Sequence, residues 1–232
     1  MIPLLLAALL ALVPAAGFRP QARGRVIDAV RAAVNRQAIT DSDVRQAAWY
    51  SRLVGDLHHD PGGPRAAPPP LTAGQRRGTL DHLISEALLA QARRQAGVGG
   101  RPPAPALRAA VDQQLKRMQT LAGGAAAWPV VLRRYHLSAA AVRAILTRQL
   151  QLLLFADAHC RPRVRVRPTD VAAYYRQTFL PLARQGHIRP APLAAVAPDI
   201  RAILIQRQLL HLELQWIARL RARARVQVFP VP

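Results

Sequence analysis

The most apolar stretch of the chain lies near its carboxyl end, between Ala197 and Leu220. Its apolar residues recur at helical spacing, at Ile200, Ile203, Leu204, Leu210, Leu214, Ile217 and Leu220, with Leu209, Leu212 and Trp216 widening the face. Pro198 suits a first helical turn, so the pattern predicts a helix from Pro198 to Ala224, about 40 Å long. Because so wide an apolar stripe is not stable in water, we expect this helix to pack on earlier segments.

Alternating apolar and polar positions predict short strands near both ends of the chain. Residues 225–229 alternate in this way, as a half-buried strand does. Residues 26–35 and 37–40 predict a strand pair joined at Asn35 and Arg36. Residues 161–168 alternate arginine with valine, which fits a strand with a basic outer face or an extended basic linker. We prefer the strand, because its valines could pair with the tail and the hairpin.

The segments between these strands and the terminal helix predict further helices. Thr40 with Asp43 resembles a capping box, and the helix that follows turns Val44, Ala48 and Leu53 inward. Helical spacing or capping signals also occur in residues 71–97, 105–122, 128–137, 139–158 and 169–175, with Ser138 as a cap before residue 139. Glycine and proline predict a loop from Leu57 to Pro70. The expected class is mostly α with a small β-sheet.

Composition supports helix and leaves the partner open. Aromatic residues make up 5% of the chain, while alanine, leucine and arginine dominate, which favours helix over sheet. The net charge of +21 is compatible with a nucleic-acid-binding protein. Against this alternative, Lys116 is the sole lysine, the arginines are dispersed along every segment, and no nucleic-acid-binding motif is visible.

Residues 1–17 form an apolar block that ends in small residues, a pattern typical of a secretory signal peptide. The block is too short to span a bilayer. It carries no Lys or Arg before its apolar region, which departs from the usual pattern of a signal peptide. Cleavage after Ala15 and after Gly17 are both compatible with it, and an uncleaved anchor or a buried helix is the alternative. With Cys160 as the only cysteine, an intramolecular disulfide is excluded, and we expect a buried or inert thiol.

Several strings of residues resemble the SurA-type periplasmic chaperones. The opening, from Val26 to Val44, is similar to the short hairpin that leads into the first helix of that family, although Arg36 stands where Gly or Asp is common. Residues 83–98 resemble the second helix, residues 169–175 resemble the helix before the family's isomerase module, and residues 216–229 resemble its closing helix and strand. The resemblance implies one domain over residues 18–232, built from both chain ends and closed by a long carboxyl-terminal helix.

The same resemblance implies that the catalytic module is missing. In the family a parvulin-type prolyl isomerase domain is inserted before the terminal helix, whereas here residues 184–197 form only a short linker. Phosphate-loop, dinucleotide-binding and Gly-x-Ser-x-Gly motifs are absent from the sequence. The pairs His58-His59 and His159-Cys160 lack the further ligands or orienting groups of a zinc site or an activated thiol. We expect no catalytic residue, metal or cofactor, and an ordinary solvated ion pair at Glu86.

The resemblance and the predicted export signal imply an ATP-independent periplasmic holdase. It would bind unfolded secreted or outer-membrane proteins in an apolar cleft rimmed by arginines. Met118, Leu121 and Trp128 are the candidate client contacts, since the break at Gly123 and Gly124 could expose them, and ordinary core packing is the alternative. The rival functions are a degenerate peptidyl-prolyl isomerase, a basic nucleic-acid-binding protein and a module specific for one envelope protein.

Overall fold

The computed structural model describes residues 28–60, 68–98 and 104–230. Over these residues the protein is mostly helical with a small three-stranded antiparallel sheet, so the predicted class is confirmed. The predicted signal peptide at residues 1–17 lies outside the described residues. The helices are α1 (Asp41–His59), α2 (Ala73–Gln95), α3 (Pro105–Leu121), α4 (Trp128–Arg134), α5 (Ala139–Cys160), α6 (Pro168–Tyr174), α7 (Leu180–Gln185) and α8 (Leu193–Arg223), with a π-helical stretch, η2 (Tyr175–Phe179), between α6 and α7.

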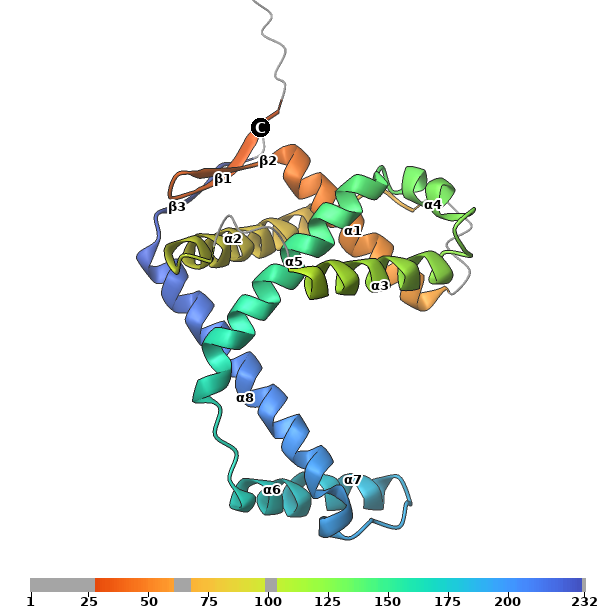
Figure 1. The fold of residues 1–232 in the computed structure, drawn as a ribbon, viewed down its shortest axis with the longest axis vertical. Helices are drawn as coiled ribbons and strands as arrows, with labels where there is room; N and C mark the ends of the chain where they lie inside the picture. The colour runs from red at the N-terminus through yellow and green to blue at the C-terminus, as the bar shows by residue number, and fades with distance from the viewer. Residues whose placement is uncertain (1–27, 61–67, 99–103, 231–232) are drawn as a thin grey trace, which may run out of the picture.

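The elements form a larger upper body and a smaller lower lobe (Figure 1). Helices α1 to α5 and the sheet make up the upper body. Helices α6 and α7 and the first turns of α8 make up the lower lobe, where α6 contacts both η2 and α8. Helix α8 joins the two parts and contacts α2 and α5 higher up. The apolar length of α8 is therefore shared between two packing partners.

The sheet brings the two ends of the chain together. Strands β1 (Val30–Val34) and β2 (Gln37–Thr40) form the predicted hairpin, and β3 (Val226–Val228) pairs with β1 to give the order β2-β1-β3. In the antiparallel register Ala32 faces Val228 and Val34 faces Val226. Ala32 and Val34 are completely buried, since alternate residues of β1 point into the core. The predicted strand in the tail is confirmed.

Caps predicted from the sequence start two of the helices. The Thr40 hydroxyl accepts from the Asp43 backbone N–H, and the Asp43 carboxylate accepts from the Thr40 N–H, which completes a capping box at α1. The Ser138 hydroxyl accepts from the Ala141 N–H at the start of α5. These contacts satisfy backbone donors that a helix start leaves without partners. Both predicted helix starts are confirmed.

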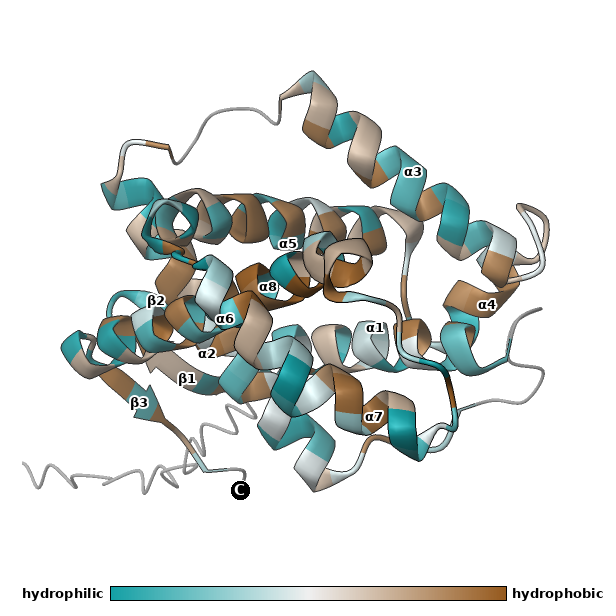
Figure 2. Ribbon diagram, turned by 90° about the horizontal axis from the view of Figure 1, so that it is seen from below, coloured by the Kyte–Doolittle hydropathy of each residue, from teal (hydrophilic) through white to brown (hydrophobic). Residues whose placement is uncertain are grey.

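Three groups of buried side chains stabilise the fold. One lies between α1, α3, α4 and α5 around the completely buried Tyr135 and Leu53. A second, around Val34 and Ile84, lies beneath the sheet, and a third joins α2, α5 and α8 around Trp216. Figure 2 shows the apolar faces of these helices turned toward one another in the upper body. Helix α8 is therefore held in the fold by the third group.

The predicted strand at residues 161–168 is wrong. Residues Arg161–Arg163 form a 3-10 turn, and the chain from Val164 to Arg167 is irregular, outside the sheet. Pro162 and Pro168 lack the backbone N–H that a ladder needs. The Arg165 N–H donates to the side chain of Gln208 on α8, 2.8 Å away. The segment therefore attaches to a helix, as an extended linker.

Helix boundaries differ from the sequence predictions at two places. Helix α8 begins at Leu193, five residues before Pro198, so the expected linker at residues 184–197 contains the end of α7 and the start of α8. Pro198 is tolerated because the one helical hydrogen bond that it removes lies close to the helix start. Helix α1 continues to His59 because Leu57 is buried in the core, so the predicted loop begins later. Residues 61–67 of that loop lie outside the described residues.

Candidate binding groove

An apolar groove of about 600 Å³ lies between α2, α3, α5 and α8. Its apolar lining comes mainly from α5 and α8, with one leucine from α2. The apolar lining residues are Leu89, Ala110, Leu146, Leu150, Leu152, Leu153, Ala156, Trp216 and Ile217. We call this hollow the apolar groove.

Helix α5 supplies one wall because its leucines repeat at helical spacing. Leu146, Leu150 and Leu153 are four and three residues apart, so they lie on one side of the helix. Leu153 is 56% exposed, while Leu152 on the adjacent side is buried against α8. Residues Ala139–Arg163 are long and apolar enough, by length and composition, to cross a membrane. Within their most apolar 18 residues, only 28% is buried in the protein. Helix α5 thus carries more apolar surface than the core covers.

Trp216 forms the floor of the groove on α8. Its indole stacks on His159, with ring centroids 3.9 Å apart, and also contacts Phe155. Both partners lie near the end of α5, so the ring stack fixes the crossing of α5 and α8. Burial, aided by the nearby Arg163 and Arg219 charges, lowers the pKa of His159. The neutral ring favoured by that shift suits stacking on an indole.

An exposed apolar stripe on α8 continues the groove toward the lower lobe. Ile203, Leu210 and Leu214 are 41%, 57% and 58% exposed. They are seven and four residues apart, so they lie on one side of the helix, and Ile217 in the groove follows three residues later. We call Ile203, Leu210 and Leu214 the α8 stripe. The groove and the stripe together give α8 apolar side chains open to solvent from Ile203 to Ile217.

Polar side chains from α3, α5 and α8 surround the apolar groove. Gln113, Gln114 and Arg117 of α3, Gln149 of α5 and Glu213 of α8 are among its lining residues. Burial raises the pKa of Glu213, and the negative charge of Asp157 adds to that shift. Amide and guanidinium groups at this rim can hydrogen-bond the backbone of a bound chain.

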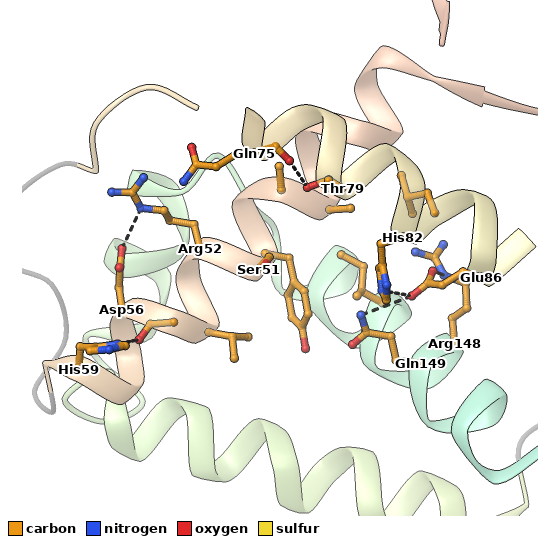
Figure 3. A pocket seen from close by; sticks show the side chains of 18 residues that line it. Ser51, Arg52, Asp56, His59, Gln75, Thr79, His82, Glu86, Arg148 and Gln149 are labelled. Carbon is orange, nitrogen blue, oxygen red and sulfur yellow. Dashed lines mark hydrogen bonds and ion pairs between the residues drawn. The ribbon is translucent and has the colours of Figure 1, made fainter. Parts of the chain in front are cut away.

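Glu86 of α2 is buried, while its ion-pair partners His82 and Arg148 are 62% and 49% exposed, so the expectation of an ordinary solvated ion pair is wrong for the carboxylate (Figure 3). Its Oε1 is 3.1 Å from His82 Nε2, and its Oε2 is 3.0 Å from Arg148 Nε. Gln149 donates to Oε1 at 3.5 Å. Burial would raise the pKa of Glu86, but the His82 hydrogen bond and the Arg148 charge outweigh it and lower the pKa. The carboxylate therefore stays ionised although α5 covers it.

A second, more polar hollow of about 860 Å³ lies on the other side of the Glu86 cluster, between α1, α2 and α5 (Figure 3). Arg52, Asp56 and His59 of α1 lie along one end of it. The hollow and the apolar groove share Tyr50, His82, Glu86 and Gln149. The Glu86 cluster therefore separates a polar hollow from an apolar one and ties α2 to α5 between them.

The candidate client contacts predicted from the sequence do not line the groove. Met118 and Trp128 are each 4% exposed within the core around Tyr135, and Leu121 packs against the same core. Residues of α1, α3, α4 and α5 pack together in this core and cover Met118 and Trp128. The expected exposure is therefore wrong for these two residues, whose alternative of core packing is confirmed, whereas Leu121 is only partly buried and its client contact stays a prediction. The sequence pattern that could have pointed to the groove is the leucine repeat of α5 together with the apolar residues of the α8 stripe, and neither was predicted to bind clients.

The described part of the chain contains no group of three or more His, Cys, Asp or Glu residues that could hold a metal ion. His58 and His59 each hydrogen-bond through Nδ1 to a backbone carbonyl four residues earlier in α1. Cys160 is buried, as predicted, and burial raises the pKa of its thiol. A thiol with a raised pKa is a poor nucleophile, so the His159-Cys160 pair does not resemble an activated cysteine.

Comparison with known proteins identifies no family. No protein-family model matches the sequence, and no curated protein matches it. The apolar groove and the α8 stripe are therefore the observations from which a function can be argued.

Proposed function

We propose that this protein is an ATP-independent holdase of the periplasm that binds unfolded secreted or outer-membrane proteins. The carrying observation is the open apolar surface formed by the groove and the α8 stripe. A soluble protein that leaves contiguous apolar surface exposed commonly uses it to bind a partner. A groove with apolar walls and amide and guanidinium groups at its rim suits a client whose side chains vary, because the rim can bond the client backbone.

The exposed leucines set the strength of such binding. Leu210 and Leu214 are each more than half exposed, so covering either one contributes about 1 kcal/mol of the 1.5–3 kcal/mol gained by full burial. Several contacts of this size, offset by the entropy of ordering the client, give weak and reversible binding. Outer-membrane strands alternate apolar and polar residues, so every second side chain of a client could enter the groove.

The sequence resemblance to SurA-type chaperones supports this proposal. The β1–β2 hairpin leads directly into α1, and the carboxyl-terminal strand pairs with that hairpin. Between the helix that contains Tyr174 and α8 there is room only for η2, α7 and a short connection, so the proposal includes no isomerase module and no catalytic step. The predicted signal peptide supports a periplasmic location for the protein and its clients in this proposal.

Suppression of aggregation tests the proposal. Purified protein is added at equimolar amounts to an unfolded porin as its denaturant is diluted, and light scattering is followed. The wild-type protein should lower the scattering. The L210Q/L214Q variant should bind the porin about 30-fold more weakly, because it loses about 2 kcal/mol of apolar contact. Both positions are exposed, so the variant should remain folded.

The matched control is V130Q/L154Q, which also replaces two exposed apolar residues, neither of which lines the groove. It should suppress aggregation as well as the wild-type protein. Wild-type protein that leaves scattering unchanged, or a control variant as impaired as L210Q/L214Q, would contradict the proposal. Acceleration of X-Pro isomerisation in a protease-coupled peptide assay would favour the isomerase alternative instead.

A further inference from the structure

Two arginines, Arg201 and Arg219, lie on the side of α8 that faces away from the α8 stripe. The linker after α5 runs beside the lower half of α8 (Figure 1). The Arg165 N–H donates to the Gln208 side chain, and Arg201 donates to the Val166 carbonyl at 3.3 Å. These two contacts hold the linker backbone at Arg165 and Val166 against α8 at Arg201 and Gln208. Arg165 and Arg201, which are far apart in the sequence, therefore lie close together.

The outer arginines of the linker are neutralised, while the inner ones are not. Arg161 pairs with Asp157, and Arg167 pairs with Asp170. Arg163 and Arg165 donate instead to backbone carbonyls of the same linker and of the end of α5, which leaves their charge uncompensated.

Two arginines of α8 add to this positive charge. Neither Arg201 nor Arg219 forms a salt bridge with any carboxylate of the described residues. The positive charges of Arg163 and Arg219 both help to lower the pKa of His159 at the end of α5. We call Arg163, Arg165, Arg201 and Arg219 the arginine strip.

The strip and the client surface point in different directions. Arg201, Gln208 and Arg219 are seven and eleven residues apart, so they share one side of α8. At 3.6 residues per turn, that side lies about 150° around the helix axis from Leu210 and Leu214. A partner bound to the strip would therefore leave the α8 stripe open.

We propose that the arginine strip docks the protein on the anionic phospholipid surface of a membrane, with the α8 stripe facing away from the bilayer. This rests on the proposed function, which locates the protein in the periplasm, where phospholipid and not nucleic acid is within reach. Guanidinium groups bind phosphate oxygens in a bidentate manner, and basic residues near an anionic bilayer each add to the binding free energy. Docking would hold the holdase where unfolded chains leave the membrane.

Vesicle sedimentation tests the docking surface with the full chain. Phosphatidylcholine vesicles are compared with vesicles of equal parts phosphatidylcholine and phosphatidylglycerol. Binding to the neutral vesicles measures the combined apolar contribution of residues 1–17, the apolar groove and the α8 stripe. The wild-type protein should bind the anionic vesicles more tightly, and salt should weaken that binding.

The R163Q/R165Q/R201Q variant should lose about 100-fold in affinity for anionic vesicles, at about fivefold for each arginine. Glutamine keeps a hydrogen-bond donor at each position while removing the charge. The matched control, R36Q/R76Q/R77Q, removes three charges from exposed positions of the hairpin and α2, and it should bind nearly as the wild-type protein does. An equal loss in both variants would mean that net charge alone drives binding, and would overturn the proposal.

Two further results would also overturn it. One is equal binding of the wild-type protein to neutral and anionic vesicles. The other is tighter binding to duplex DNA than to anionic vesicles at physiological salt, with that DNA binding lost in the strip variant, which would make the strip a nucleic-acid surface. Aggregation suppression measured on the strip variant without vesicles should match the wild-type protein. The vesicle assay can therefore contradict membrane docking while aggregation suppression still supports the holdase function. Likewise, loss of aggregation suppression can contradict the holdase function while the vesicle assay still shows docking.

Discussion

Asn35 joins the two ends of the chain, and its replacement should loosen that joint. It sits in the turn between β1 and β2 with φ of 56°, in the left-handed region. Its backbone N–H donates to the Arg225 carbonyl at 2.8 Å, and its side-chain oxygen accepts from the Arg225 N–H at 2.9 Å. Its side-chain amide also donates to Gln91 of α2 at 2.6 Å. One residue thus connects the hairpin, β3 and α2.

The Asn35→Ala change should destabilise the fold by about 2–3 kcal/mol. Alanine in the left-handed region costs about 1 kcal/mol, and each of the two lost side-chain hydrogen bonds contributes about 0.5–1 kcal/mol at an exposed site. Asn35→Gly removes the same hydrogen bonds while tolerating the positive φ, so it should cost about 1–2 kcal/mol. Arg36→Ala, at the neighbouring exposed position, should cost about 0.5 kcal/mol or less.

Urea unfolding at equilibrium measures these differences. For a chain of this size, the Asn35→Ala loss corresponds to a fall in Tm of about 5–10 °C. Amide hydrogen exchange locates the effect, because β3 should lose protection in both Asn35 variants while α3 keeps it. Equal stability of Asn35→Ala and the wild-type protein, or unchanged protection of Gln227 and Phe229, whose N–H groups face β1, would refute the role of Asn35 as the joint between the chain ends.

Three further predictions follow from the buried groups. The Glu86 hydrogen bond raises the pKa of His82. The stability that this pair contributes is therefore complete below pH 6.5, the ordinary pKa of histidine, and is lost as the pH rises through the raised pKa. Urea unfolding across this pH range should show the loss in the wild-type protein and not in Glu86→Gln. Tyr135→Phe removes a 2.6 Å hydrogen bond from the buried phenol to Asp56 and should cost about 1–2 kcal/mol in the same assay, whereas an unchanged midpoint would show that the bond is not formed in solution. Trp128→Ala should lower stability by about 3–5 kcal/mol yet leave aggregation suppression intact where the protein stays folded, and a selective loss of suppression would restore Trp128 as a client contact.

The periodic helices and the local caps could be predicted from the sequence. The capping box at Thr40 and the Ser138 cap depend on side chains that bond backbone groups three residues away, so a short window of sequence contains the whole interaction. The hairpin at Asn35 is equally local, because asparagine tolerates the left-handed conformation that the turn requires. These elements formed where the sequence predicted them.

The candidate binding site could not be located in this way. The apolar spacing that placed Met118 and Trp128 in a helix is the same for a side chain covered by neighbouring helices and for one left open, as Leu210 is. Valine and arginine alternate in residues 161–168 as they would in a strand. The Arg165 N–H, however, donates to the Gln208 side chain on α8 and not to a neighbouring strand. Glu86 among arginines fits a solvated pair equally well until α5 covers it.

By itself, therefore, the sequence determined the helical class, the capped starts of α1 and α5, the hairpin and the alternating tail, because each depends on residues within a turn or two of one another. The tertiary structure alone decided which apolar faces stay exposed, where the arginines gather and that Glu86 is buried. Those outcomes depend on which distant helix packs against each face, and helical periodicity is the same whether that partner is another helix or water.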